Sequence, residues 1–295
     1  METAKYEAVL TAAESGSLTA AAEAMGYTQP GVTRMVRSLE AELGLTLLVR
    51  TTRGVELTAS GRELLPALRE ALRAARRVEE EASQVRGMLR GELVVGSYYS
   101  VSARLLPNVL ARFCTDHPDV RVRVREGGNQ EMARWLAERS VDLCFAATPT
   151  EGVVCDWVPV LSDELVAWLP TSHPRAHDAA FPVLALDGEP FVVTMQGQDT
   201  DIDRLLAEHG VAPDFRFSTS DAYATWCMVE AGLGVSMNQR LISERWEGTV
   251  AQVPFDPPQH VELGLAIPSL ADASPATRAF VDCVRENIPS QRSAD

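Results

Sequence analysis

Hydrophobic residues recur every three or four positions in the segment 28–43, which is the spacing of one face of a helix. The stripe consists of Val32, Val36, Leu39 and Leu43. Thr28 stands in front of it as a candidate N-cap, and Pro30 falls in the first turn, where its missing N–H costs nothing. The side chains off the stripe are polar or basic: Gln29, Thr33, Arg34 and Arg37. The pattern therefore predicts a helix with one buried face and one outward, partly basic face.

The preceding residues predict two more short helices. One apolar face, made by Tyr6, Val9, Leu10 and Ala13, ends at 15–17, where Ser17 can cap a second helix over 18–25. Gly26 then allows a tight turn before the helix that starts after Thr28. Two helices joined by a short turn that contains glycine are typical of a helix-turn-helix. The alternative is an ordinary three-helix bundle with glutamine and arginine on its surface.

The outward residues carry the chemistry of DNA recognition. Glutamine can read adenine, arginine can reach guanine or phosphate, and a threonine or proline can contact the thymine methyl group. Two short strands are expected next, over 45–50 and 55–57, with Arg53 in the turn between them, where it could enter the minor groove. The alternative for Arg53 is a solvated turn residue. The candidate DNA-binding residues are Ser17, Thr28, Gln29, Pro30, Thr33, Arg34, Arg37, Arg50 and Arg53.

A long amphipathic helix is expected to follow, capped by Thr58 or Ser60. Its apolar positions repeat every seven residues, at Leu64, Ala71, Val78 and Val85, interleaved with Leu68, Ala75, Ala82 and Leu89. Such a heptad seam needs a partner helix. The partner is a second copy of the chain or, alternatively, other parts of the same chain.

From residue 90 on, short strands alternate with helices, which indicates a doubly wound α/β architecture. In the first unit strands are expected over 93–96, 120–124 and 142–146, with one helix spanning 105–113 and another over 132–138. A second unit begins near 163, with strands over 165–169, 191–194, 215–217 and 232–236 and helices over 202–209 and 222–231. The strand 261–267 and the helix 275–288 are expected to return to the first unit.

Ligands of such sheets bind beyond the carboxyl ends of the strands. Serines after the first strand precede a helix N-terminus, where hydroxyl and N–H groups favour an anion such as a carboxylate. The alternative is that these residues are only caps and turn formers. The candidate effector-binding residues are Ser97, Ser100, Ser102, Gly128, Asn129, Thr194, Met195, Gln196, Ser220 and Asp221.

Composition and charge narrow the functional classes. The chain of 295 residues is 46% hydrophobic, and no apolar run approaches the ~20 residues that span a bilayer, nor does its start resemble a signal peptide. We therefore expect a cytoplasmic protein that does not bind membranes. The net charge of −14 argues at first against DNA as a partner. Residues 1–87, however, carry 11 basic and 12 acidic side chains, so nearly all of the excess negative charge lies in residues 88–295. Phosphate binding needs only a local basic face.

Little in the sequence points to catalysis, metal binding or a cofactor. The five cysteines are odd in number and show no Cys-x-x-Cys spacing, so we expect reduced thiols. His173 and His177 are four residues apart, but Pro174 prevents the helix that would align them on a metal. Neither a Gly-x-Ser-x-Gly motif nor a phosphate-binding loop is present. We expect a protein that is not an enzyme.

The first sixty residues, aligned in one register without gaps, resemble the LysR-type transcriptional regulators. The resemblance rests on the motif Ala20-Ala21-x-x-Met25-x-x-Thr28-Gln29-Pro30-x-x-Thr33-Arg34, then Leu39-Glu40-x-x-Leu43-Gly44, Leu47-Leu48-x-Arg50-Thr51 and Leu57-Thr58-x-x-Gly61. Two positions depart from the family pattern. Leu48 stands where phenylalanine is usual, and Gly31 lies inside the recognition helix, where it costs ~1 kcal/mol relative to alanine.

The resemblance implies an all-α winged helix-turn-helix head over 1–58, a linker (dimerisation) helix over 59–89 and an α/β effector-binding domain over 90–295. That domain is expected to have two lobes like those of periplasmic binding proteins, lobe I at 90–162 and 264–295 and lobe II at 163–263. The implied function is a homo-oligomeric regulator, dimer or tetramer, that binds an inverted-repeat site in double-stranded DNA. It would respond to a small-molecule effector, here a small organic acid, and would contact RNA polymerase if it is an activator.

Two other functions are compatible with parts of the sequence. The peroxide-sensing branch of the resembled family uses two nearby cysteines in lobe II, whereas here Cys227 is the one cysteine there. A thiol-based redox regulator on the same scaffold is therefore an alternative. A solute-binding protein would share the last two-thirds of the chain, but it would need export and has no use for the first domain.

Overall fold

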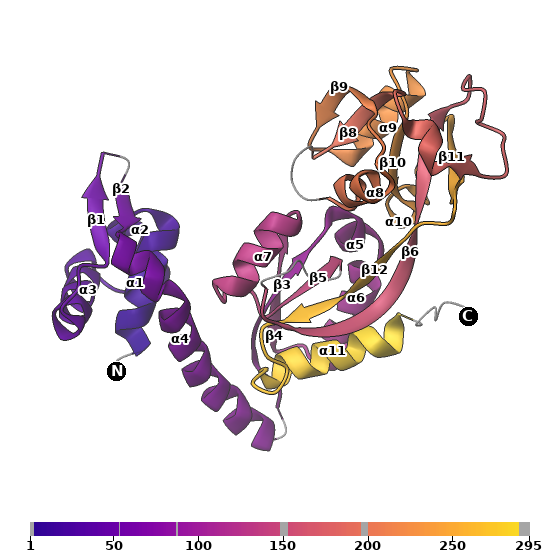
Figure 1. The fold of residues 1–295 in the computed structure, drawn as a ribbon. Helices are drawn as coiled ribbons and strands as arrows, with labels where there is room; N and C mark the ends of the chain where they lie inside the picture. The colour runs from indigo at the N-terminus through magenta and orange to yellow at the C-terminus, as the bar shows by residue number, and fades with distance from the viewer. Residues whose placement is uncertain (1–2, 53, 87, 148–152, 196–199, 289–295) are drawn as a thin grey trace. The chain divides into compact units, whose positions relative to one another are not determined.

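Three helices form the start of the chain in the computed structural model, which describes residues 3–52, 54–86, 88–147, 153–195 and 200–288 (Figure 1). They are α1 (Thr3–Ser15), α2 (Leu18–Met25) and α3 (Gln29–Leu43). Ser17 and Thr28 cap α2 and α3 through their hydroxyls, and Gly26 ends α2 at φ 70°, as the sequence predicts. Val32, Val36 and Leu39 enter the core, but Leu43 is 44% exposed because α3 ends there. The predicted stripe was therefore one residue too long.

A two-stranded wing follows, with β1 (Leu48–Thr51) antiparallel to β2 (Gly54–Leu57). The expected strand over 45–50 begins three residues later than predicted. The carboxylate of Glu40 accepts the backbone N–H groups of Leu47 (2.8 Å) and Leu48 (3.1 Å), so the end of α3 ties down this segment. At the other strand, the N–H of Val55 donates to the carbonyl of Gly16, which joins the wing to the turn between α1 and α2.

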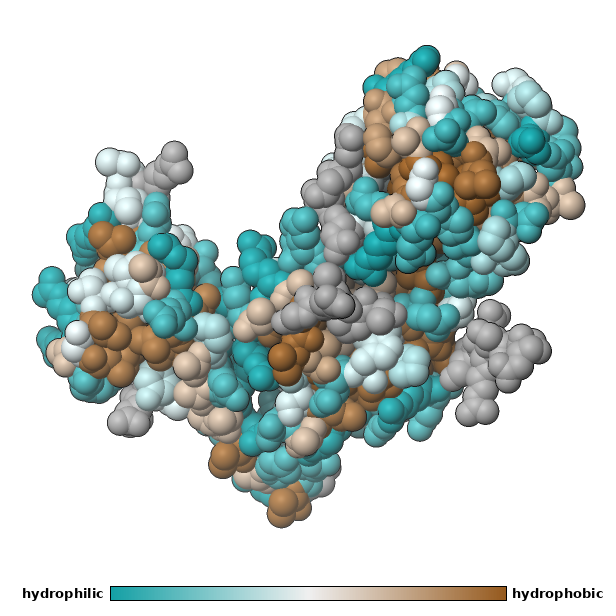
Figure 2. Space-filling view, in the orientation of Figure 1, coloured by the Kyte–Doolittle hydropathy of each residue, from teal (hydrophilic) through white to brown (hydrophobic). Residues whose placement is uncertain are grey.

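The long helix α4 (Ala59–Val85) is capped by Thr58, whose hydroxyl accepts the N–H of Gly61 at 2.9 Å, and not by Ser60. Leu65 and Leu68, in its first half, belong to the core of the head. Further along, Val78 is 68% and Val85 88% exposed. Figure 2 shows hydrophobic surface at this end of α4. The heptad seam is thus divided between the head's own core and solvent, and Leu89 lies beyond the end of the helix.

Lobe I is a sheet with strand order β4-β3-β5-β12-β6. Its own elements are β3 (Gly91–Ser97), α5 (Tyr99–Arg104), α6 (Leu106–Asp116), β4 (Val120–Glu126), α7 (Asn129–Ala137) and β5 (Leu143–Ala147), with β3 parallel to β5. The helix predicted over 105–113 corresponds to α6, which begins one residue later with Pro107 in its first turn, and a separate short helix, α5, precedes it. The last helix, α11 (Pro275–Asn287), returns to this lobe, because Phe280 packs edge-on against Phe113 with ring centroids 5.2 Å apart.

Lobe II contains the rest of the chain. Its elements are β7 (Phe181–Pro182), the 3-10 helix η1 (Val183–Leu186), β8 (Pro190–Thr194), α8 (Asp201–His209), β9 (Asp214–Thr219), α9 (Ala222–Glu230), β10 (Ser236–Gln239), α10 (Arg240–Ser243) and β11 (Val250–Asp256). β8 and β9 are parallel. The predicted strand 232–236 is wrong for residues 232–234; Val235 forms an isolated parallel bridge with Phe191, and β10 begins at Ser236. No strand was predicted over residues 250–256, which form β11.

Two long strands belong to both lobes. β6 (Asp156–Pro170) pairs with β12 (His260–Ile267) through its first part and with β10 and β11 through its second. Figure 1 shows β6 as one curved strand running from lobe I into lobe II. The lobe boundaries expected at 163 and 263 fall inside these strands, so β6 and β12 connect the two lobes.

The chain as a whole divides into two compact units. One comprises residues 1–91 with the short segments 137–140 and 274–276, and the other comprises the remaining residues. Both lobes belong to the second unit. Within the described residues, no helix has the length and apolar character needed to cross a bilayer.

Candidate functional site

The first candidate site is the outer face of α3. Arg34 and Arg37 are exposed there, as are Thr28 and Pro30 at the start of the helix. The side chain of Gln29 donates to the hydroxyl of Thr33 at 2.9 Å, and that hydroxyl donates to the backbone carbonyl of Gln29 at 2.9 Å. These two contacts hold both side chains in one geometry on the first two turns of the helix.

The other candidates for DNA contact lie around this helix. Arg50 is exposed on β1 of the wing; Ser17 is partly buried, and its hydroxyl accepts the N–H groups of Thr19 and Ala20. Arg53 lies outside the described residues. The face therefore combines two exposed arginines of α3 with an ordered glutamine–threonine pair, which suits a major groove, where side chains read base edges and phosphates.

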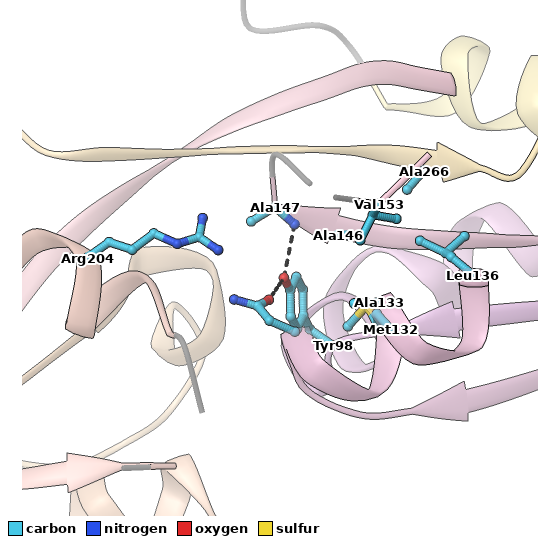
Figure 3. Close-up of a pocket in the computed structure, with 10 residues that line it drawn as sticks. Tyr98, Met132, Ala133, Leu136, Ala146, Ala147, Val153, Arg204 and Ala266 are labelled. Carbon is cyan, nitrogen blue, oxygen red and sulfur yellow. Dashed lines mark hydrogen bonds between the residues drawn. The ribbon is translucent and has the colours of Figure 1, made fainter. Parts of the chain in front are cut away.

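The second candidate site is a pocket of the second unit, about 320 Å³ of empty space including its open mouth. Three side chains of α7, Met132, Ala133 and Leu136, form much of its wall. The complete lining is Tyr98, Asn129, Met132, Ala133, Leu136, Ala146, Ala147, Val153, Arg204 and Ala266. Figure 3 shows the side chain of Arg204 reaching from α8 of lobe II toward Tyr98 and Ala147 of lobe I. Both lobes thus contribute to the pocket.

A small polar group stands at the mouth of this pocket. The phenol of Tyr98 donates to the side-chain oxygen of Asn129 and accepts the backbone N–H of Ala147 at 3.0 Å (Figure 3). Burial raises the pKa of Tyr98 well above its usual range; the charge of Asp201 raises it further, and that of Arg204 lowers it. The phenol is therefore a neutral hydrogen-bonding group at physiological pH, with one cation and one carboxylate in its surroundings.

Of the effector candidates predicted from sequence, Asn129 lines this pocket. Ser97 is fully buried and donates to the carbonyl of Tyr98, and Ser100 is 4% exposed within α5. Gly128 donates its N–H to Glu131 at 3.1 Å, at the start of α7. The hydroxyl of Ser102 is buried without a hydrogen-bond partner among the described residues.

In lobe II the predicted candidates are caps or strand-end residues. Thr194 is buried, with its hydroxyl 2.7 Å from that of Thr225. Met195 has a positive φ of 56°, an uncommon conformation for a residue with a side chain. Asp221 caps α9 by accepting the N–H of Ala224 at 2.7 Å, while the neighbouring Ser220 is exposed. Gln196 lies outside the described residues.

Sequence reasoning missed the two residues that define the mouth of the pocket. Tyr98 lies among the predicted serines, directly after β3, but its aromatic ring gave no polar signal. Arg204 lies within the predicted helix 202–209 and carries no local signal at all, because its role depends on the approach of two lobes that are about a hundred residues apart in sequence.

Burial favours the neutral thiol form of three of the cysteines. Burial raises the pKa of Cys144 to about 12, and burial likewise raises the pKa of Cys155 and of Cys283. Cys114 and Cys227 are exposed, and all five thiols are free. Redox chemistry, which requires a reactive thiolate at an accessible position, would have to use an exposed cysteine.

Two family models match the chain. Residues 4–62 match "Bacterial regulatory helix-turn-helix protein, lysR family", and residues 86–289 match "LysR substrate binding domain". Among curated proteins, the uncharacterized HTH-type transcriptional regulator YvbU of Bacillus subtilis is 29% identical over 93% of this chain and 94% of its own length. A RuBisCO operon transcriptional regulator of Allochromatium vinosum and a probable hydrogen peroxide-inducible genes activator of Mycobacterium avium are each 30% identical, over 79% of this chain and 76% of their own lengths.

Solved structures show the same fold. A full-length OxyR variant from Pseudomonas aeruginosa superposes with a TM-score of 0.78 at 23% identity, covering 97% of this chain and 94% of that one. Full-length CbnR in complex with its target DNA gives a TM-score of 0.65 at 24% identity, covering 97% and 100% of the two chains.

Proposed function

Because this chain belongs to the LysR family of DNA-binding transcriptional regulators, we propose that it responds to a small organic acid bound between its two lobes. The observation that carries this proposal is the placement of Arg204. Its guanidinium side chain lines a pocket together with the phenol of Tyr98 and the amide of Asn129. A guanidinium is well suited to bind a carboxylate, since it can donate two parallel hydrogen bonds.

We propose that DNA is read by the outer face of α3. In this proposal Gln29, Thr33 and Arg34 contact base edges, while Arg37 and Arg50 contact phosphates. The ordering of Gln29 by Thr33 means that less side-chain entropy is lost when the helix enters a groove. Ser17, Thr28 and Pro30, around the N-termini of α2 and α3, complete the proposed interface, and Arg53 would extend it into the minor groove.

The second half of α4 is proposed to pair with the same helix of another copy. Val78 and Val85 are largely exposed on a heptad repeat, and burying such a seam against a partner removes apolar surface from water. A paired arrangement presents two recognition helices to an inverted-repeat DNA site. Dimers and tetramers both satisfy this requirement. RNA polymerase would be a further partner if the output is activation.

We propose that the two sites are coupled through the angle between the lobes, which share β6 and β12. An acid that contacts Arg204 in lobe II and Tyr98 in lobe I favours one angle between the lobes, and a ligand shifts a conformational equilibrium by its differential affinity for the two states. We propose that this angle sets the spacing of the DNA-binding heads.

The test is DNA affinity and footprint with and without candidate acids, on the full-length protein. A change in either with a saturable concentration dependence supports the proposal. An acid that binds the protein but leaves both DNA affinity and footprint unaltered would contradict the proposal. Arg204→Gln should lose the response, whereas Arg112→Gln, at an exposed position of α6, should retain it.

A thiol-based input is the second candidate, favoured by the match to peroxide-inducible activators and by the exposure of Cys227. It requires a second thiol or a stable sulfenic acid, and the described cysteines form no disulfide. A variant with both exposed thiols replaced, Cys114→Ser and Cys227→Ser, that still signals would eliminate this candidate.

A further inference from the structure

The two lobes also meet where α5 of lobe I packs against α10 of lobe II. The guanidinium of Arg104, at the end of α5, donates to the carboxylate of Glu244, which directly follows α10. The side chain of Arg104 is 12% exposed and that of Glu244 is 59% exposed. This ion pair, the interlobe pair, therefore joins a nearly buried cation of one lobe to a solvated anion of the other.

A buried carboxyl group lies at the other end of α10. The Oδ1 atom of Asp163, on the shared strand β6, accepts the backbone N–H of Leu241 at 3.2 Å, and Glu244 follows three residues later. The two positions of the helix that hold the carboxyl groups are therefore about one turn, ~5 Å, apart. Asp163 is 7% exposed. The cation of the interlobe pair needs only a short movement to reach it.

Two buried atoms of these side chains have complementary, unused hydrogen-bonding capacity. Among the described residues, the Oδ2 atom of Asp163 accepts no hydrogen bond and the Nε–H of Arg104 donates none. A buried donor or acceptor without a partner is costly, and an ionised carboxylate is costlier than a neutral carboxyl group. The arrangement in which Arg104 pairs with Glu244 therefore suits a protonated Asp163 and becomes unfavourable when Asp163 ionises.

Other charged side chains near Asp163 are directed elsewhere. Arg240, the first residue of α10, donates to Glu164 at 2.7 Å. On β12, His260 and Glu262 flank the residue that pairs with Asp163, so their side chains point to the opposite face of the sheet, and both are exposed. Arg104 is therefore the cation with an unused buried donor at this contact.

The ionisation of Asp163 falls in the neutral range. Burial raises its pKa from 3.8 to about 7; the hydrogen bond from Leu241 and the charge of Arg240 lower it, and the charge of Glu244 raises it further. A solvated or cation-paired aspartate has a pKa of about 4 or below. The protonated arrangement is therefore favoured at low pH and loses that advantage as pH rises through 7. By this linkage, the ratio of an ionised, rearranged state to the protonated one rises about tenfold from pH 6 to pH 8.

We propose that Arg104 leaves Glu244 for Asp163 when Asp163 releases its proton to water, which makes this contact between the lobes a pH-sensitive switch. In the protonated state the interlobe pair holds α10 against α5. In the ionised state the N–H groups of Arg104 satisfy the buried carboxylate, Glu244 returns to water, and the contact between α5 and α10 loosens. The effect of the switch on DNA rests on the proposed function, in which the lobe angle sets the spacing of the heads.

Hydrogen exchange of the full-length protein, followed by mass spectrometry at pH 6 and pH 8 and corrected for the intrinsic exchange rate, tests the switch. Protection of the amides of α5 and α10 should fall about tenfold between the two pH values. The fall should be insensitive to low urea concentrations, because a local rearrangement exposes little surface. Unchanged protection, or a fall with the steep urea dependence of global unfolding, overturns the proposal.

Three variants identify the groups responsible. Asp163→Asn mimics the protonated carboxyl group, so protection of α5 and α10 should stay high at both pH values. Glu244→Gln removes the charge that holds Arg104, so protection should be low at both. Asp282→Asn, exposed on α11, is the matched control and should respond as wild type. A wild-type pH response in Asp163→Asn overturns the proposal, and the same response in Glu244→Gln does so even if Asp163→Asn fails to fold.

DNA affinity at pH 6 and pH 8 separates this inference from the proposed function. Asp163→Asn should differ from Asp282→Asn in the pH dependence of its DNA affinity. If protection of α5 and α10 switches through Asp163 and DNA affinity does not follow, the switch stands and the coupling in the proposed function fails. If protection does not switch, this inference fails and the organic-acid function is untouched.

Discussion

Asp163 of β6 accepts the backbone N–H of Leu241 of α10 through its Oδ1 atom at 3.2 Å, at the point where β6 passes from one lobe to the other. The carboxyl group is buried, and its Oδ2 atom has no hydrogen-bond partner among the described residues. Charged neighbours surround it, since Glu164 pairs with Arg240, and Glu244 pairs with Arg104 of α5. A buried, half-satisfied carboxyl thus lies on a strand that both lobes share.

Asp163 makes stability depend on pH. Burial raises its pKa from 3.8 to about 7, against the hydrogen bond from Leu241 and the charge of Arg240, while Glu244 raises it further. Between about pH 4 and 7 the unfolded chain has released this proton and the folded chain keeps it, so the contribution is present at low pH and is lost as pH rises through 7. We expect Asp163→Asn to remove on the order of 1–3 kcal/mol of the fall in unfolding free energy between pH 5 and 8.

Urea unfolding of the full-length protein at the two pH values checks this. Asp282→Asn, an exposed residue of α11, is the matched control and should keep the wild-type pH dependence. An Asp163→Asn protein with the full wild-type dependence would show that the carboxyl is already ionised in the folded state.

Arg34 should contribute directly to DNA binding. Arg34→Ala is expected to weaken specific binding by about 1–3 kcal/mol if the residue reads a base, or to reduce the salt slope by about one if it contacts phosphate. Ser100→Ala, buried in lobe I, should leave basal DNA binding unchanged; the sequence further predicts that it blunts the response to the effector. Fluorescence anisotropy over a range of salt concentrations separates these effects. Equal losses of DNA binding in both variants would contradict the assignment of Arg34 to DNA binding and of Ser100 to the effector response.

Gly61 is expected to tolerate no side chain. An added Cβ would lie 2.3 Å from the backbone carbonyl oxygen of Leu47, between the start of α4 and the segment before the wing. Gly61→Ala should therefore cost about 1–3 kcal/mol of unfolding free energy through overpacking. Ser60→Ala, in the same helical turn, should change stability by less than about 0.5 kcal/mol. Chemical unfolding followed by circular dichroism measures both, and equal stabilities would contradict the close approach.

Val78 should be needed for self-association. The residue is 68% exposed on α4, so Val78→Glu does not disturb the core of the head but places a charge in the proposed helix pair. We expect the variant to dissociate into smaller species at micromolar concentration, whereas Gln84→Glu, also exposed on α4, should behave as wild type. Sedimentation velocity measures the size of the oligomer for both variants. A Val78→Glu oligomer as stable as the wild type would place the interface elsewhere.

The elements with strong local signals could be predicted from the sequence. Ser17, Thr28 and Gly26 bound their helices as expected, because capping and left-handed conformations are properties of single residues and their immediate neighbours. The wing and β10 were misplaced where tertiary contacts decide, as when Glu40 holds the N–H groups of Leu47 and Leu48. A contact of that kind has no local pattern.

The pocket was predictable only in part. Asn129 was found because a polar residue after a strand and before a helix has a recognisable position, but the hydroxyls of Ser97 and Thr194 turn to partners in their own lobe. Arg204 was missed because its neighbours in the pocket come from another lobe. Periodicity indicates which face of an element is buried, and it gives no information about which two faces meet.

The most direct test of the whole account is the affinity of the full-length protein for a duplex selected from random sequence, measured with and without an organic acid that the protein binds. We predict preference for the selected duplex over random DNA, weakening steeply with salt, and a shift in affinity or footprint on adding the acid that Arg204→Gln abolishes. Salt-insensitive binding without sequence preference, or an identical response in wild type and Arg204→Gln, would contradict it.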